Sequence, residues 1–521
     1  MRMLKIKDFI KNISYLPFLY GTFPILFLFA HNISELKYEM LWAPLLTVIF
    51  VILVFTVVLR IFIKDYRKSG LILSLFFLLF LSYGNFKELV SGGWLEGIGV
   101  IRDTYLYPFG VLLFGLASYF IMKSGDSKIV YGFFKTTGCV LIVVSLVSIG
   151  SSAYSNRRNN SVFLDDASRS ESSQNQNLPD IYYIIPDTYA RADVLKELYD
   201  YDNSEFINFL KGKGFSVLSD SKSNYQNTMI SIPSTLNMDY LDNLLPETIR
   251  EDDFKNMVQN SRVQQFLKER GYKIIYFDSG YGITSYNKYA DIKFNSSYIN
   301  DFSRQIIETS VLKYFLVKRK LFGFSIKNEE RKRILYSIDK LKEIPEMEVG
   351  GPKFVFLHIN SPHTPFLFDR NGKDVDVDWY SVTSPEEYNS LWLDQLIFIS
   401  GQLRSAVEEI LARSKTEPII VIQSDHGLEV MAQGSPEEFF QSDTFTEARI
   451  KNFSAFYLPG NKKKTLPNNL TNVNTFRFIF KNYFNADFNL LENKIYRYFD
   501  YSLLKRHSDL KNMKQVPKSL L

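Results

Sequence analysis

The chain has 521 residues, of which 46% are hydrophobic and 22% charged, and its mean hydropathy is −0.09. These averages exclude a disordered, collagen-like or coiled-coil protein, but they conceal two different parts. Leu, Phe, Ile and Val dominate residues 1–155, which carry a net charge of +6, whereas the remainder resembles a soluble α/β protein in composition and carries −1. The overall charge of +5 is therefore no reason to expect a nucleic-acid partner.

Five apolar segments of the first part approach the roughly 20 residues that a transmembrane helix needs. They cover residues 13–30, 41–63, 70–83, 104–122 and 129–149, and the third is short. We predict a helix that crosses the membrane at each of them. Cys139, the only cysteine, lies in the last segment, which excludes an intrachain disulfide and a C-x-x-C metal or redox site.

Basic residues in the connections predict the orientation of these helices. Eleven Lys and Arg residues lie in the N-terminal tail, in the connections after the second and fourth segments, or in the segments beside these connections. The other connections hold only Lys37, Lys87 and Arg102, with several acidic residues beside them. The N-terminus is therefore expected in the cytoplasm, and an odd number of spans places everything after residue 155 outside it.

The stretch 151–177 is rich in Ser and Asn and nearly free of aromatic residues, which is typical of a flexible tether. The predicted organisation is a transmembrane domain with five helices (1–153), a linker (154–178), an extracytoplasmic α/β domain (179–500) and a polar C-terminal tail (501–521). The expected location is a bacterial inner or cell membrane.

Short apolar runs alternate with helical patterns after residue 178. We expect strands near 180–186, 272–277, 354–359, 418–423 and 453–458, and helices near 204–211, 263–270 and 386–413. This alternation predicts a mainly parallel sheet covered by helices on both faces. Active sites of such sheets form beyond the carboxyl ends of the strands.

Three of the expected strands end in residues that can bind a metal. Asp187 follows the first, His358 lies near the end of another with His363 five residues later, and Asp425 and His426 follow a third. An Asp after a strand often only caps a helix, and a lone buried His is often only packed. Together, however, two carboxylates and an imidazole suit one divalent ion, either zinc or manganese.

A possible nucleophile lies at Thr228, where an extended segment is expected to join a helix. A hydroxyl at a helix N-terminus faces free backbone N–H groups, and that position suits a phosphate or sulfate. Ser and Thr at such positions usually act only as caps. A hydroxyl that also binds a metal becomes a stronger nucleophile.

These residues resemble motifs of the sulfatase-like branch of the alkaline phosphatase superfamily, in its membrane-anchored form. The similar groups are lipoteichoic acid synthases and lipid A phosphoethanolamine transferases, which have five transmembrane helices, a linker and an outward catalytic domain. The matching motifs are T-x-x-S-x-P at residues 228–233, S-D-H-G at 424–427, H-x-x-x-x-H-x-P at 358–365 and the acidic Asp187. The resemblance implies that Thr228 is the nucleophile and that Asp187, Thr228, Asp425 and His426 hold the metal. It also implies that His358 and His363 bind the transferred group.

The sequence departs from these groups at several positions. Asp187 stands where both transferase groups usually have Glu, and residues 428–460 lack the further His of phosphoethanolamine transferases. The run Ser231-Ile-Pro-Ser234 is similar to the C/S-x-P-S-R motif of true sulfatases, but Thr235 replaces its Arg.

The resemblance implies a two-step displacement. Thr228 would attack the phosphorus of a membrane phospholipid, so that its phosphoglycerol or phosphoethanolamine head group becomes bound to the threonine. A hydroxyl of a cell-surface glycan or glycolipid would then take this group. Two alternatives stay open: a membrane-anchored phosphodiesterase or sulfatase, in which water replaces the acceptor, and an inactive scaffold.

Overall fold

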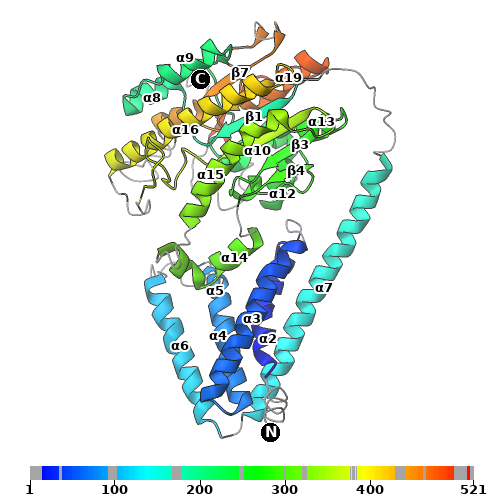
Figure 1. Cartoon of the computed structure of the whole chain (residues 1–521), viewed down its shortest axis with the longest axis vertical. Coiled ribbons are helices and arrows are strands. Elements are labelled where there is room, and N and C mark those ends of the chain that lie inside the picture. The colour runs from blue at the N-terminus through cyan, green and yellow to red at the C-terminus, as the bar shows by residue number, and fades with distance from the viewer. Residues whose placement is uncertain are drawn as a thin grey trace. The chain divides into compact units, whose positions relative to one another are not determined.

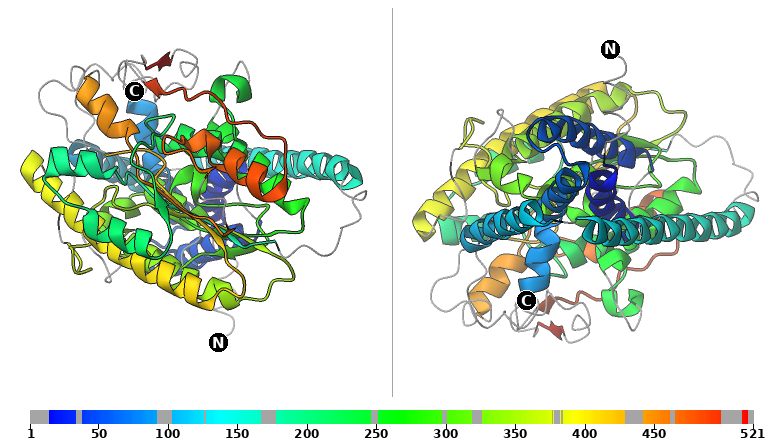
Figure 2. Two further views of the ribbon diagram at one scale, coloured as in Figure 1. Left: turned by 90° about the horizontal axis from the view of Figure 1, so that it is seen from above. Right: turned by 90° about the horizontal axis from the view of Figure 1, so that it is seen from below.

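The computed structural model divides the chain into two compact units, Met1–Arg169 with Tyr298–Ile326, and Ser170–Ser297 with Lys327–Leu521. Figures 1 and 2 show their ribbons. The structure describes residues 14–33, 38–91, 103–125, 127–166, 178–245, 251–296, 301–318, 326–375, 377, 382, 384–428, 442–460, 465–497 and 513–516. The predicted basic N-terminal tail lies outside these residues.

The first unit is helical. Its successive helices are α2 (Leu16–His31), α3 (Glu39–Phe62), α4 (Tyr66–Leu81), α5 (Tyr83–Ser91), α6 (Asp103–Lys123) and α7 (Lys128–Asp166). Two elements from the second half of the sequence belong to the same unit, namely α14 (Asp301–Thr309) and the π-helix η4 (Tyr314–Lys318). The sequence alone had placed these two elements in the domain 179–500.

Three helices of the described chain are long and apolar enough to cross a membrane, at Glu39–Phe62, Tyr105–Lys123 and Lys128–Ser151. Helices α2 and α4 cover most of the first and third predicted spans, but each has 16 residues. At 1.5 Å per residue each is about 24 Å long, which is less than a typical hydrocarbon core of about 30 Å. The count of five spans therefore stays a prediction.

The predicted linker differs from the structure over its first half. Helix α7 continues to Asp166, so residues 154–166 are helical rather than a flexible tether. No Gly or Pro interrupts residues 151–166, and extending an existing helix adds one hydrogen bond for each residue that is fixed. Residues 167–177 of the linker lie outside the described residues. In the expected polar tail, β9 (Lys514–Gln515) pairs with β8 (Tyr496–Arg497).

The second unit is built on a seven-stranded sheet with the order β2-β7-β6-β1-β5-β3-β4. Its strands are β1 (Ile181–Pro186), β2 (Ser216–Val217), β3 (Lys273–Phe277), β4 (Ile292–Phe294), β5 (Lys353–Ile359), β6 (Ile419–Gln423) and β7 (Ser454–Tyr457). Only β7 runs against the others, since it pairs antiparallel with both β2 and β6. The prediction of a mainly parallel sheet is confirmed, and all five expected strands are present.

Alternate residues of β1 point into two different hydrophobic cores, as expected for a strand with both faces buried. On one face, Tyr182 and Ile184 pack among residues of α8 (Ala192–Tyr199), α9 (Ser204–Gly212), α15 (Ile326–Glu343) and α16 (Pro385–Arg413). On the other face, Ile181, Tyr183 and Ile185 pack among residues of α10 (Thr228–Asn237), α12 (Glu251–Gln259), α13 (Arg262–Lys268) and α19 (Thr475–Phe484). In Figure 2 (left), the yellow α16 and the orange-red α19 lie on opposite sides of the sheet.

Candidate metal centre

The candidate site lies where the three central strands end. β1 runs between β5 and β6 and is parallel to both, so the three strands bring their carboxyl ends to the same edge. Asp187 comes directly after β1, His358 is the next-to-last residue of β5, and Asp425 and His426 follow β6 after one intervening residue. All four side chains are buried, each with 1% exposure.

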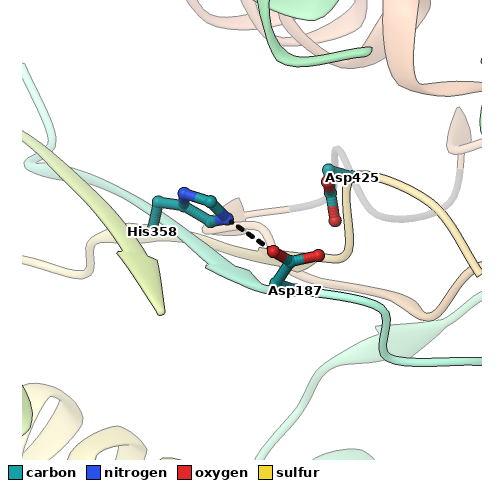
Figure 3. Close-up of side chains that lie close together, drawn as sticks. All are labelled: Asp187, His358 and Asp425. Carbon is teal, nitrogen blue, oxygen red and sulfur yellow. Dashed lines mark ion pairs between the residues drawn. The ribbon is translucent and has the colours of Figure 1, made fainter. Parts of the chain in front are cut away.

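The charged atoms of these side chains face one another. Nε2 of His358 lies 3.5 Å from Oδ2 of Asp187, as Figure 3 shows. Nε2 of His426 lies 3.3 Å from Oδ2 of Asp425 and 3.7 Å from Oδ1 of Asp187. One ligand atom from each of Asp187, His358 and Asp425 lies within 4.8 Å of the other two. The structure therefore places His358, expected as a residue for the transferred group, among the possible metal ligands.

The donor set fits a divalent cation. Oδ1 of Asp187, Oδ2 of Asp425 and Nε2 of His358 are buried and have no hydrogen-bond partner among the described residues. Two buried carboxylates side by side are costly unless positive charge compensates them. Two carboxylate oxygens and imidazole nitrogens are a common ligand set for zinc and for manganese.

The ionisation of the site depends on these contacts. Burial raises the pKa of Asp187, but the neighbouring His363, His358 and His426 lower it, with a net result below the usual range. Burial and the negative charge of Asp187 raise the pKa of Asp425 to about 7. Burial and the charge of Arg449 lower the pKa of His426 to about 3, so its imidazole is neutral and able to bind a metal at neutral pH.

Thr228 is brought to this cluster by the start of α10. Asn227 caps the helix by accepting a hydrogen bond from the backbone N–H of Met229. Oγ1 of Thr228 lies 3.3 Å from Nε2 of His426. The hydroxyl of Ser231, one turn later, instead donates to the backbone carbonyl of Asp425 at 2.6 Å. Of these two hydroxyl groups, that of Thr228 faces the candidate ligands.

The other two residues of the S-D-H-G motif hold the turn after β6. Oγ of Ser424 accepts from the backbone N–H of Tyr189 at 2.9 Å and donates to the carbonyl of His426 at 2.6 Å. A Cβ atom at Gly427 would overlap the carbonyl oxygen of Ala448. The serine and the glycine are therefore needed for the backbone path that presents Asp425 and His426.

The remaining predicted residue, His363, is half-buried, and its Nδ1 lies 2.6 Å from the carbonyl oxygen of Thr364. Its charge reaches the cluster, because it lowers the pKa of Asp187. It is not one of the three residues whose ligand atoms lie within 4.8 Å of one another.

Sequence reasoning missed three residues around the site. Thr284, from the 3₁₀ turn η3 (Gly282–Thr284), places Oγ1 2.8 Å from Nδ1 of His358. Thr188 has a φ of +63°, which is rare for a β-branched residue and turns the chain sharply after Asp187. Arg449 donates from Nε to the carbonyl of Gln226, two residues before Thr228, while its Nη1 is buried without a partner among the described residues. Each of these depends on contacts distant in sequence, and no local pattern marks it.

No family model matches the chain, and a search of curated proteins finds no match. Solved structures with a similar arrangement include the periplasmic domain of EptC from Escherichia coli in complex with zinc (12% identity, 62% of this chain and 91% of that one, TM-score 0.42). Another is the same domain of phosphoethanolamine transferase EptC from Campylobacter jejuni (14% identity, 61% of this chain and 92% of that one, TM-score 0.38). A third is the integral membrane lipooligosaccharide phosphoethanolamine transferase A from Neisseria meningitidis (11% identity, 89% of this chain and 94% of that one, TM-score 0.38). At these identities and TM-scores, the function of this chain rests on its own residues.

Proposed function

We propose that the chain is a metal-dependent transferase that moves a phospholipid head group through a covalent intermediate on Thr228. One observation carries this proposal: the Thr228 hydroxyl, at the N-terminus of α10, lies beside a buried cluster of carboxylates and imidazoles. Three polar atoms of this cluster have no hydrogen-bond partner among the described residues. A nucleophile, a place for an anion and a place for a cation thus meet at one point.

In this proposal Asp187, Asp425, His426 and His358 hold the cation, with Thr228 in contact with it. When bound, a divalent cation makes the hydroxyl of Thr228 more acidic and offsets negative charge on the transferred group. The backbone N–H groups at the start of α10 face the same group. Arg449 adds positive charge beside the cluster, since it lowers the pKa of His426.

The proposed reaction has two steps. Oγ1 of Thr228 forms a bond to phosphorus while the bond from phosphorus to the diacylglycerol oxygen breaks, and the threonine proton ends on that oxygen. A hydroxyl of the acceptor then forms a bond to the same phosphorus while the bond from phosphorus to Oγ1 of Thr228 breaks, and the proton of the acceptor hydroxyl ends on Oγ1. The proposed donor is a membrane phospholipid with a phosphoglycerol or phosphoethanolamine head group, and the proposed acceptor is a surface glycan or glycolipid.

Membrane attachment favours transfer from a lipid over hydrolysis of a soluble ester. The three long apolar helices support an integral membrane protein, and the distribution of basic residues supports a catalytic unit outside the cytoplasm. The sulfatase alternative is weaker, because the hydroxyl of Ser231, the residue that this alternative needs, is buried and bonded to the backbone of Asp425. An inactive scaffold would have no use for three unpartnered buried polar atoms.

Mass spectrometry tests the proposal directly. The full-length protein in detergent is loaded with zinc or manganese, incubated with phosphatidylglycerol or phosphatidylethanolamine, quenched and digested. We expect a head-group phosphate on the peptide that contains Thr228, and its mass identifies the group. An adduct on Ser231, or turnover with no trapped adduct on either residue, would overturn the proposed intermediate. Rapid release of the head-group phosphate without an acceptor would instead identify a hydrolase.

A further inference from the structure

A segment from the catalytic half of the sequence packs with the helical unit. Residues Tyr298–Ile326 group with Met1–Arg169, although the sheet strands on either side of them in sequence, β4 and β5, belong to the other unit. Its described part consists of α14, the turn at residues 310–313 and η4. Figure 1 shows α14 beside α5 and the upper end of α3.

The apolar face of α14 is buried in the core of the helical unit. Phe302 is fully buried, and its ring lies edge-on to that of Phe29, with 5.2 Å between the centroids. Ile306, one turn later, is 8% exposed and belongs to the same cluster, which contains residues of α2, α3 and α4. Because such burial removes apolar surface from water or lipid head groups, it is the main source of attachment for a nine-residue helix.

Backbone contacts extend the packing beyond α14. The N–H of Val311 donates to the carbonyl of Phe80, at the end of α4, over 3.0 Å. Gly84 of α5 lies so near Thr309 that an added Cβ would be 2.7 Å from Cα of that residue. The backbone at Thr309 therefore packs so closely against α5 that position 84 has room only for a glycine.

Aromatic rings complete the contact. The ring of Tyr314 lies 4.9 Å from that of Tyr107, near the start of α6, and Tyr107 stacks on Tyr83 at 4.6 Å. Tyrosines are enriched where membrane helices meet the interface. The contacted residues of α2, α4, α5 and α6 all lie next to the connections that the charge pattern places outside the cytoplasm.

We propose that the segment Asp301–Lys318 is an interfacial clamp, by which the chain of the catalytic unit is attached to the outer ends of the membrane helices independently of the chain after α7. The partner of this surface is the helical unit itself, through Phe29, Phe80, Gly84 and Tyr107. The clamp gives the catalytic unit a second connection, and this inference does not depend on which reaction the site performs.

A full-length protein with a protease site inserted in residues 167–177, an N-terminal affinity tag and a C-terminal epitope tests the clamp. After complete cleavage in detergent, the N-terminal fragment is captured and the co-captured C-terminal fragment is measured. We expect the cleaved fragments to stay together, and Phe302→Asp to reduce the retained fraction at least tenfold. The matched control is Lys313→Ala, since this side chain in the same segment is exposed.

A second variant, on the other side of the contact, tests the clamp if Phe302→Asp impairs folding. Gly84→Val places its side chain against the backbone of Thr309 and should also release the catalytic fragment. Gly110→Val is its control, because an added Cβ there meets no described atom within 4 Å. Release of the unmodified fragment on cleavage would overturn the clamp. Retention of both the Phe302→Asp and the Gly84→Val fragments at the unmodified level would overturn it equally.

Discussion

Oγ1 of Thr284 lies 2.8 Å from Nδ1 of His358, while Nε2 of the same imidazole faces Asp187 at 3.5 Å. The threonine hydroxyl can donate to the carbonyl of Tyr281, at 3.3 Å, and can then accept a hydrogen bond from the N–H of Nδ1. This arrangement leaves the lone pair of Nε2 directed at the candidate metal centre. We therefore expect Thr284 to act as a positioning residue that selects the metal-binding tautomer of His358.

Removing the hydroxyl of Thr284 should weaken metal binding but not abolish it, because the other proposed ligands stay in place. We expect Thr284→Val to reduce metal affinity about 10- to 100-fold, the usual cost of losing a partner of a metal-bound histidine. Thr284→Ser keeps the hydroxyl and should restore most of the affinity. Competition with a chromogenic chelator measures both variants. Equal affinities for the valine variant and the unmodified protein would contradict this role.

Metal affinity should also depend on pH through Asp425. Burial and the charge of Asp187 raise the pKa of Asp425 to about 7, so without metal this carboxyl is increasingly protonated below that pH. A cation must displace the proton, and the apparent affinity should therefore fall about tenfold per pH unit below about 7 and level off above it. Calorimetric titrations in buffers of different ionisation enthalpy should detect the released proton. An affinity that stays constant from about pH 5.5 to about pH 8 would argue against this carboxyl as a ligand.

The sequence predicted much of the sheet and of the metal centre because both leave local signals. Buried strands of apolar residues are visible as runs, and Asp187, Asp425 and His426 follow such runs directly. Parallel strands then bring their ends together, so the spacing of these residues along the chain does not matter. His358 was expected to bind the transferred group rather than the metal. Its register partner on β1 is Ile185, and only the folded arrangement of the side chains brings its Nε2 to 3.5 Å from Oδ2 of Asp187.

The sequence could not reveal which unit a short amphipathic helix packs against. The Asp301–Thr309 stretch has the pattern of any surface helix, and its burial depends on a surface formed by residues more than 200 positions earlier. No sequence pattern marks Thr284 either, since it lies in an irregular turn and contacts a histidine 74 residues later. The helical extension of α7 was missed because composition was used to predict flexibility, whereas a preceding helix favours continuation.

The two hydroxyl groups of α10 should respond differently to removal. Thr228→Ala should lower turnover on the order of 10⁴-fold or more, as expected for loss of a nucleophile. Ser231→Ala removes a hydrogen bond to the backbone of Asp425 and should cost about tenfold or less. Release of diacylglycerol from a labelled phospholipid measures both, and metal content checks that each variant keeps its site. A larger loss in the Ser231 variant would transfer the nucleophile role to that residue.

Gly280 follows Ser279, whose Oγ lies 2.7 Å from Oγ1 of Thr284. Its φ is +76°, and an added Cβ would overlap Nη1 of Arg333, a buried residue whose Nε lies 3.7 Å from Oδ2 of Asp278. We expect Gly280→Ala to lower the free energy of unfolding of the catalytic unit by about 2–4 kcal/mol, since the left-handed backbone and the displaced guanidinium both cost energy. Gly282→Ala is the matched control two residues away, where φ lies outside the left-handed region and an added Cβ meets no described atom within 4 Å. It should change stability by less than about 0.5 kcal/mol. Denaturant unfolding followed by aromatic fluorescence compares the two variants, and equal stabilities would show that Arg333 can move aside at little cost.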